Sequence, residues 1–594
     1  MPVAEREDRS VINRGKVAVR EGQLVLESDV FRDDISGSAK AIHCGWRLPV
    51  KREHPCAKIL ARCATVFVLM PSMYAQQEAS PRHAGVPQDW SARHVIFSRD
   101  SLTLHPDLIY RERRVLHQAM QRWQAPDSNV FHGAASRPGA AYGSGSERDW
   151  SVSLGGRLVA NMSPAKYSFD PGAPPDCTND YVVFGLAIPS ANGGHPNLVA
   201  FNHLYAGAGG LCGSAPKVVF AYNITTAPGG KIVTSPVLSE DGTKIAFVES
   251  VGTSAIFHVL TWTAGQGTLQ SAAAPSAMAS LTYSMSSKDT TSSPWIDYDS
   301  DTVYVGADKG LIYKITGVFR GTPTIAGAPW PVTVSTNSRV TSPVFDATLN
   351  VLMVGSANGI LYKVNTQTGA LSKLAVGKSG RTSPGIVAAP VVDVGNGTTF
   401  VVSADDGTSG VLVEADTASL TQLAKARLGE AAAGGTPFSL YNPVFSNDYF
   451  NDPSTGVARL CGTGATDTTP WQYAFGFTGR ILQTTPVFSQ QLPTNPSAST
   501  AARCTEWTEF FNPNINGGTD FFFFGLTQDC TASGTAGGCV LGLTGDSTFT
   551  TATVNGGPSG IVVDNYSTAG QASSIYLTAE RQNTAYKFTQ NGLR

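Results

Sequence analysis

The chain has 594 residues, which is enough for several domains or for one large repeat fold. Charged residues make up 15% of it, well below the roughly 25% of ordinary soluble domains, whereas 61 glycines and 35 prolines are typical of a turn-dense all-β protein. A net charge of −2 gives no reason to expect nucleic acid or an anionic membrane as a partner, and 42% hydrophobic residues exclude global disorder.

The N-terminus begins with two segments of different composition. Residues 1–47 are dense in charge and show no secondary-structure period, so we interpret them as an unstructured or wrongly assigned leader, with the true start near residue 48. In residues 48–75, basic side chains precede a short apolar run that ends at the small residue Ala75, which is the pattern of a secretory signal peptide. The run is too short to span a bilayer, so we expect no membrane span. The alternative is a buried strand or helix.

Residues 76–148 form an extension, helical or irregular, that does not match the repeats in the rest of the chain. Residues 106–124 have helical spacing, with arginines on one face and an apolar stripe on the other. The stripe consists of Ile109, Leu116, Met120 and Trp123. We expect this helix to dock on the rest of the fold through the stripe, because those side chains would otherwise lie in water. Residues 134–145, rich in Gly, Ala and Ser, predict a linker.

Residues 341–369 are the prototype of a repeat that continues to the C-terminus. They predict strands at 343–345, 351–354 and 360–365, with a tight turn at Asn358 and Gly359. A fourth strand, 370–376, comes next. The run Val-Leu-Met-Val at 351–354 does not alternate, so that strand is expected to be covered on both faces. Four antiparallel strands per repeat, buried on both sides, describe one blade of a β-propeller.

Each repeat has a proline next to its first strand, where proline is tolerated. The number of these prolines therefore predicts the number of blades. Eight such prolines occur, at Pro164, Pro236, Pro294, Pro343, Pro390, Pro443, Pro486 and Pro558. The last unit supplies only three strands, ending at 584–590, and an unassigned strand at 150–154 precedes the first unit. We therefore predict an all-β, eight-bladed β-propeller over residues 149–594, closed by pairing the strand at 150–154 with the one at 584–590.

The sequence Gly-Ile-Leu-Tyr-Lys-Val-Asn-Thr-Gln-Thr-Gly at 359–369 resembles the quinoprotein-type, or PQQ-like, propeller repeat. Residues 308–317 match that repeat in part, and residues 239–247 resemble the WD40-like repeat of TolB-type propellers. The resemblance implies the propeller fold. Family members that oxidise alcohols or sugars hold a quinone with calcium, and the alcohol-oxidising ones commonly place a disulfide between adjacent cysteines beside it. This chain has no adjacent cysteines and no matching ligand set, so we assign no cofactor, metal-binding or catalytic residue.

Six of the nine cysteines lie after the proposed signal peptide, and an even set in an exported protein predicts disulfides. The positions of the cysteines in the repeats suggest the pairs Cys177–Cys212 in the first blade, Cys461–Cys504 between neighbouring blades, and Cys530–Cys539 around a Gly-rich loop. The alternative is six buried reduced thiols. Paired C-x₂-C spacing, which a Cys₄ zinc site requires, is absent.

These observations favour a secreted or periplasmic propeller that binds a protein or carbohydrate ligand on one face, through long loops of the first and seventh blades. The alternative is a periplasmic oxidoreductase or carbohydrate-active enzyme of quinoprotein-like fold. An enzyme is expected to bring several carboxylates or a metal cage to the central channel. A channel lined by Ser, Thr and small apolar residues favours binding.

Overall fold

The structure is a computed structural model with two compact units, Met1–Pro81 and Arg82–Arg594. The residues it describes are 18–20, 23–25, 85–122, 146–169, 174–285, 290–378, 384–430, 439–464, 467, 469–495, 502–512, 518–533, 537–546, 549–565, 571–580 and 582–590. In the first unit, the described residues form an antiparallel pair of strands, β1 (Ala18–Arg20) and β2 (Gln23–Val25). The proposed signal peptide at 48–75 lies outside the described residues.

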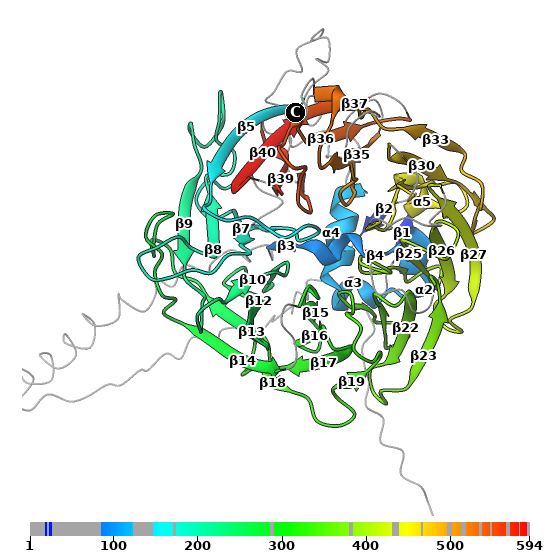
Figure 1. The fold of residues 1–594 in the computed structure, drawn as a ribbon, viewed down its shortest axis with the longest axis horizontal. Helices are drawn as coiled ribbons and strands as arrows, with labels where there is room; N and C mark the ends of the chain where they lie inside the picture. The colour runs from blue at the N-terminus through cyan, green and yellow to red at the C-terminus, as the bar shows by residue number, and fades with distance from the viewer. Residues whose placement is uncertain are drawn as a thin grey trace, which may run out of the picture. The chain divides into compact units, whose positions relative to one another are not determined.

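The described residues of the second unit form an eight-bladed β-propeller, which confirms the predicted fold class (Figure 1). Each blade is an antiparallel sheet whose strands lie side by side, ordered from the axis of the ring to its rim. The second strands are largely buried along their whole length because neighbouring blades cover both of their faces. In β21 (Val351–Gly355), for example, all five residues are buried.

The strands of blades 1 to 4 are arranged outwards in chain order. Blade 1 contains β6 (Ala165–Ser168), β7 (Tyr181–Gly185), β8 (Leu198–Asn202) and β9 (Lys217–Tyr222). Blade 2 contains β10 (Lys231–Ile232) and β11 (Val237–Leu238), which both pair with β12 (Lys244–Val251), and then β13 (Ser254–Thr261) and β14 (Met278–Ser284). Blade 3 contains β15 (Trp295–Asp297), β16 (Thr302–Ala307), β17 (Leu311–Thr316), β18 (Thr324–Ile325) and β19 (Val332–Thr333). Blade 4 contains β20 (Val344–Asp346), β21, β22 (Ile360–Asn365) and β23 (Leu371–Ala375), as predicted for the prototype repeat.

Blades 5 to 8 carry more insertions. Blade 5 contains β24 (Val391–Asp393), β25 (Thr398–Ser403), β26 (Gly410–Asp416) and β27 (Gln422–Leu428). Blade 6 contains β28 (Val444–Phe445), β29 (Ala458–Gly462), β30 (Trp471–Phe475) and β33 (Phe488–Gln491), with α5 (Asn447–Asn451) and the pair β31 (Phe477–Thr478) and β32 (Ile481–Leu482) inserted. Blade 7 contains β34 (Thr508–Asn512), β35 (Thr519–Leu526), the short helix η2 (Thr531–Ser533), β36 (Cys539–Leu543) and β37 (Phe549–Thr553). Blade 8 contains β38 (Val562–Asn565), β39 (Ser573–Thr578), β40 (Thr584–Gln590) and β5 (Ser146–Ser153).

One of the eight proline positions is wrong. Pro486 does not begin the seventh blade, because β33, the next strand after it, is the outermost strand of blade 6. The seventh blade begins instead at β34, which no proline directly precedes. The local sequences around Pro343 and Pro486 are similar, but an innermost strand is buried and an outermost strand is not, and Val487 is 59% exposed.

The ring closes as predicted, by pairing strands from the two ends of the propeller (Figure 1). β40 pairs antiparallel with β5, with Thr584 opposite Ser153. Trp150 on β5 lies between two blades: its ring centroid is 6.0 Å from that of Tyr576 and 6.3 Å from that of Phe201. The hydrogen bonds between β40 and β5 therefore complete blade 8, and Trp150 packs this blade against blade 1.

Candidate functional site

The centre of the ring holds residues 85–122 of the same chain, here called the axial segment (Figure 1, blue). Its elements are β3 (Val86–Gln88), the short helix η1 (Trp90–Arg93), β4 (Val95–Ile96), α2 (Arg99–Leu104), α3 (Leu108–Arg111) and α4 (Arg113–Arg122). The side chain of Asp89 caps η1 by accepting a hydrogen bond from the Ser91 N–H at 2.9 Å, which fixes the turn between the two strands. The axial face of the propeller is thus built from two parts of one chain.

The two strands of the axial segment extend two blades inwards. β3 pairs antiparallel with β6 of blade 1, and β4 pairs parallel with β24 of blade 5. Between them, the Trp90 indole N–H donates to the Pro294 carbonyl of blade 3 at 3.1 Å. Because these main-chain and side-chain bonds lie at separate points around the ring, the segment is held as part of the propeller core.

A largely buried ion pair fixes η1 at one end of the channel. The Arg93 guanidinium donates to Glu506 at 2.6 Å and to the Ser163 hydroxyl at 3.0 Å. His94 contacts the same carboxylate at 3.4 Å and the Pro390 carbonyl at 3.1 Å. Burial alone would raise the pKa of Glu506, but the charge of Arg93 and the contact with His94 outweigh it and lower that pKa.

A second arginine joins the start of α4 to blade 3. Arg114 donates to the Ser91 hydroxyl at 2.7 Å and to Glu112 at 2.8 Å, and its guanidinium carbon lies 4.0 Å from the ring centroid of Trp295. It also donates to the Ile296 carbonyl at 3.1 Å. Burial raises the pKa of Glu112 despite the neighbouring guanidinium. Every polar contact of this group is internal, so it serves to position the segment.

A third arginine, at the end of α4, joins the segment to blades 6 and 7. Arg122 donates to both carboxylate oxygens of Glu509, one at 3.0 Å, and its guanidinium carbon lies 3.4 Å from the ring centroid of Phe450. Asp520 lies beside Glu509 and accepts from the Asn447 N–H at 3.0 Å. Burial, and then the negative charge of Glu509, raise the pKa of Asp520 to about 8. The two carboxylates therefore share a site with one arginine.

At the same end of the channel as Arg93, four serines link the first four blades. The Ser163 N–H donates to the Ser235 hydroxyl at 2.9 Å, and the Ser235 N–H donates to the Ser293 hydroxyl at 2.9 Å. The Ser293 N–H donates to the Ser342 hydroxyl at 2.7 Å. Each serine directly precedes a repeat proline. Serines therefore line this end of the channel, but carboxylates such as Glu506 and Glu509 also lie at the axis, so the lining does not separate a binding protein from an enzyme. The repeated Ser-Pro dipeptide is the sequence signal of the serine row.

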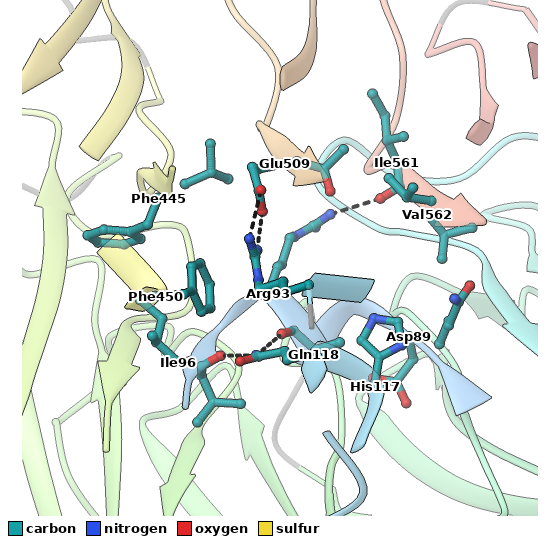
Figure 2. A pocket seen from close by; sticks show the side chains of 17 residues that line it. Asp89, Arg93, Ile96, His117, Gln118, Phe445, Phe450, Glu509, Ile561 and Val562 are labelled. Atoms are coloured by element: carbon teal, nitrogen blue, oxygen red, sulfur yellow. Dashed lines mark hydrogen bonds and ion pairs between the residues drawn. The ribbon is translucent and has the colours of Figure 1, made fainter. Parts of the chain in front are cut away.

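A small cavity remains between the axial segment and blades 6, 7 and 8 (Figure 2). Its volume is about 70 Å³, and Gln88, Arg93, His117, Arg122 and Glu509 are among the residues that line it. Burial, and then the charge of Arg122, lower the pKa of His117 to about 3, so its imidazole is neutral at pH 7. Neither amide atom of Gln88 has a hydrogen-bond partner among the described residues. The cavity has room for a few water molecules, which suit such a polar lining.

The expected helix forms as α3 and α4 and docks, but its polarity differs from the prediction. Arginines were expected on the outer face, whereas Arg114 and Arg122 are buried against the blades. The side chains of the predicted apolar stripe lie outside those described. Ion pairs with buried carboxylates of the blades override the amphipathic pattern, because a paired arginine can be buried where an unpaired one cannot.

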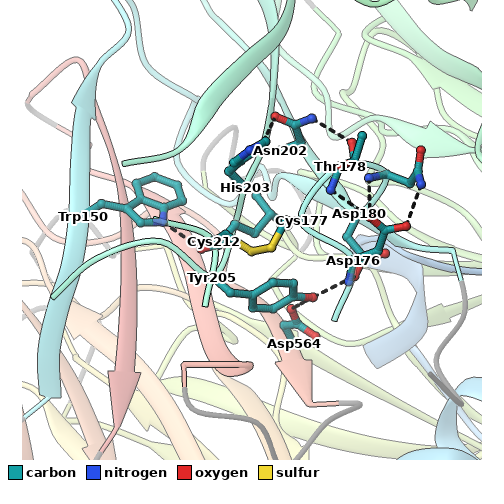
Figure 3. Close-up of a disulfide and its surroundings, with 12 residues drawn as sticks. Trp150, Asp176, Cys177, Thr178, Asp180, Asn202, His203, Tyr205, Cys212 and Asp564 are labelled. Carbon is teal, nitrogen blue, oxygen red and sulfur yellow. Dashed lines mark hydrogen bonds between the residues drawn. A yellow bond between two sulfur atoms is a disulfide. The ribbon is translucent and has the colours of Figure 1, made fainter. Parts of the chain in front are cut away.

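The six cysteines are joined in the structure as the three expected pairs. The Cα atoms of Cys177 and Cys212 are 5.4 Å apart, within blade 1 (Figure 3). Those of Cys461 and Cys504 are 6.2 Å apart, joining blades 6 and 7, and those of Cys530 and Cys539 are 5.9 Å apart. All three distances suit a disulfide. Beside the first pair, the Asn202 amide donates to the Thr178 carbonyl at 2.7 Å, which ties the loop to β8.

The described part of the chain contains neither a metal cluster nor a membrane-spanning helix. No group of three or more His, Cys, Asp and Glu residues there is arranged to hold a metal ion. No described helix is long and apolar enough to cross a membrane.

No model of a known protein family matches the sequence, and no curated protein is significantly similar to it. Among solved structures, BamB from Moraxella catarrhalis is 13% identical with a TM-score of 0.38, over 75% of this chain and 97% of that chain. Sqt1 from Saccharomyces cerevisiae is 11% identical with a TM-score of 0.46, over 74% and 98% of the two chains. The Dos1 propeller is 10% identical with a TM-score of 0.47, over 75% and 96%. Values this low establish neither shared residues nor a shared function.

Proposed function

We propose that the protein is an exported propeller that binds a protein partner through its peripheral loops, with no reaction at its axis. The observation that carries the proposal is the axial segment, which occupies the channel and leaves a cavity of about 70 Å³. Pockets for small molecules and cofactors have volumes of about 300–1,000 Å³. A substrate at the axis would have to displace three arginine–carboxylate pairs.

Export is supported by the cysteine pairing. Three disulfides form and persist in oxidising compartments such as the periplasm or the exterior of the cell. The signal-peptide pattern at residues 48–75 would direct the protein to the secretory machinery.

The residues that resemble the quinoprotein-type repeat have a structural role in this chain, and this supports a function without a quinone. The Asn365 side chain accepts hydrogen bonds from the N–H groups of Gln367 and Thr368 at 3.0 and 2.8 Å, and Gly369 has a φ of +69°. The Tyr362 hydroxyl accepts from Asn358 at 3.0 Å. These motif residues build a turn and pack a blade, and such roles need no quinone.

The blade 1 loop around Cys212 is our choice of binding surface. Leu211 is 55% exposed in a Gly-rich stretch, next to the cysteine that fixes the loop to Cys177. A loop held by a disulfide loses little conformational entropy on binding, so its exposed apolar side chain can contribute to affinity. We therefore expect the partner to present an apolar surface to Leu211.

Site-specific photocrosslinking in the secreting cell tests this choice. A photoreactive residue at position 211 should give a discrete crosslinked protein species, whereas the same residue at position 349 should not. Leu349 is a matched control because it is also an exposed leucine, in the β20–β21 turn of blade 4. Equal crosslinking at both positions, or crosslinks to glycan alone, would overturn the protein-binding assignment.

The alternative, a quinone-dependent enzyme, has a separate test. The exported protein should show no quinone absorbance and no bound calcium by mass spectrometry after purification. Recovery of either in stoichiometric amount would show that the axial segment leaves room for a cofactor.

A further inference from the structure

Blade 2 aligns three chemically complementary side chains on neighbouring strands, far from the axial segment in the sequence. Glu249 lies on β12, His258 on β13 and Ser280 on β14. His258 is directly opposite Ser280 in the strand register, so the two side chains stand on the same face of the sheet. Glu249 reaches the same imidazole from the other side, at 3.0 Å.

In the row formed by Glu249, His258 and Ser280, the hydrogen bonds determine which group donates and which accepts. Glu249 accepts from the Thr226 N–H at 2.9 Å through Oε1 and from the Thr226 hydroxyl at 2.7 Å through Oε2. A carboxylate held as an acceptor in this way takes a third hydrogen bond from His258 Nε2–H. The lone pair of His258 Nδ1 then faces Ser280 Oγ at 2.9 Å, so the serine hydroxyl donates to the imidazole.

Burial differs along the row in the way that an activated serine requires. His258 and Glu249 are fully buried, and the Phe247 ring lies 5.3 Å from the imidazole and fixes its plane. Ser280, in contrast, is exposed. The base and its carboxylate are therefore dry and positioned, while the hydroxyl can be reached from solvent.

The backbone around Ser280 provides a donor for developing negative charge. The Thr261 N–H bonds to the Ala277 carbonyl at 2.9 Å, so these two residues form a hydrogen-bonded pair of the ladder. Because such pairs alternate, His258 and Ser280 are a non-hydrogen-bonded pair, and the Ser280 N–H points away from β13. β14 is the last strand of its sheet, so this N–H lies at the outer edge of the blade.

We infer that Ser280 is a nucleophile that accepts an acyl group from esters, with His258 as its general base. Ser280 Oγ attacks the ester carbonyl, its proton passes to His258 Nδ1, and the Oγ–carbon bond forms. The bond from that carbon to the leaving alcohol breaks, and the alcohol takes the proton from Nδ1. The Ser280 N–H faces the carbonyl oxygen as charge develops on it, and Glu249 is a positioning residue that stabilises the imidazolium.

Acylation of the intact full-length protein by p-nitrophenyl acetate tests the inference. We expect the acetyl group on Ser280 by peptide mass spectrometry, its loss in Ser280→Ala, and a fall of about a hundredfold in rate in His258→Gln. Thr282→Ala, on the same strand, is the matched control and should react normally. No acetyl group on Ser280, or an equal rate in His258→Gln, would overturn the inference.

A pair of variants at exposed positions keeps the test decisive if a buried substitution unfolds the blade. Ser280→Cys should react with iodoacetamide roughly tenfold faster at pH 7 than Thr282→Cys, because a base beside the thiol favours the thiolate. Equal rates would mean that the row is only a structural network. Glu249→Gln should slow acetylation of Ser280 more than Glu249→Asp does, because aspartate keeps a carboxylate that can orient the imidazole. Equal rates in these two variants would remove the role of Glu249.

Discussion

Removing the positive charge at Arg122 should destabilise the propeller far more than removing an exposed arginine of the same segment. The Arg122 and Glu509 side chains are only 4% and 5% exposed. Breaking a buried pair by removing one partner costs about 3–5 kcal/mol, because the other charge stays buried. Loss of the contact with Phe450 adds roughly 0.5–2 kcal/mol. Arg122→Met should therefore lower the free energy of unfolding by about 3–5 kcal/mol or more.

Urea unfolding followed by tryptophan fluorescence measures this change, with Arg111→Met as the matched control. Arg111 pairs with Asp299 at 3.1 Å, but these side chains are 42% and 52% exposed, so about 0–1 kcal/mol is expected. The double variant Arg122→Met with Glu509→Met should cost less than Arg122→Met alone, because no charge is left unpaired. Equal costs at positions 111 and 122 would refute the buried ion pair.

Three other predictions concern the disulfides, the seam of the ring and pH. The exported protein should react with no maleimide under denaturing, non-reducing conditions and at six cysteines after reduction; reaction before reduction would contradict the three pairs. Deleting residues 146–153 should lower the stability of the whole propeller in one transition, and an unchanged melting temperature would contradict closure. Because the pKa of Asp520 is raised to about 8, its folded form binds more protons than the unfolded chain between about pH 4 and pH 8, so stability should fall as pH rises through that window. Asp520→Asn should flatten this dependence, and an identical pH profile would contradict it.

The blades could be predicted from the sequence because local rules determine them. The strands of residues 341–369 result from an apolar run, a turn glycine and a proline before the first strand, all of which act over a few residues. The same rules failed at Pro486, where the local sequence is that of an inner strand. Whether a strand lies at the axis or the rim depends on which neighbours cover it. In blade 6, the inserted pair β31 and β32 separates β30 from β33, so the strand after Pro486 is the fourth strand of that blade and not the first strand of the next.

The axial segment could not be located from sequence for a related reason. Its position depends on partners more than 200 residues away, such as Glu506 for Arg93 and Glu509 for Arg122. An amphipathic pattern assumes that arginine faces water, and this assumption fails when a distant carboxylate supplies the counter-charge. The Ser280 row was equally hidden, because its members become neighbours only through the register of three strands.

Hydrogen exchange of the axial segment tests whether this segment is part of the propeller core. If residues 85–97 fill the channel, the amides of β3 and β4 are protected by their pairing with β6 and β24. They should then exchange with deuterium as slowly as the amides of those inner strands do in the native protein. Peptides covering 85–97 should then gain deuterium with the same slow phase as peptides covering 165–168 and 391–393. Exchange within seconds, as in an exposed loop, would contradict the claim that this segment is part of the core.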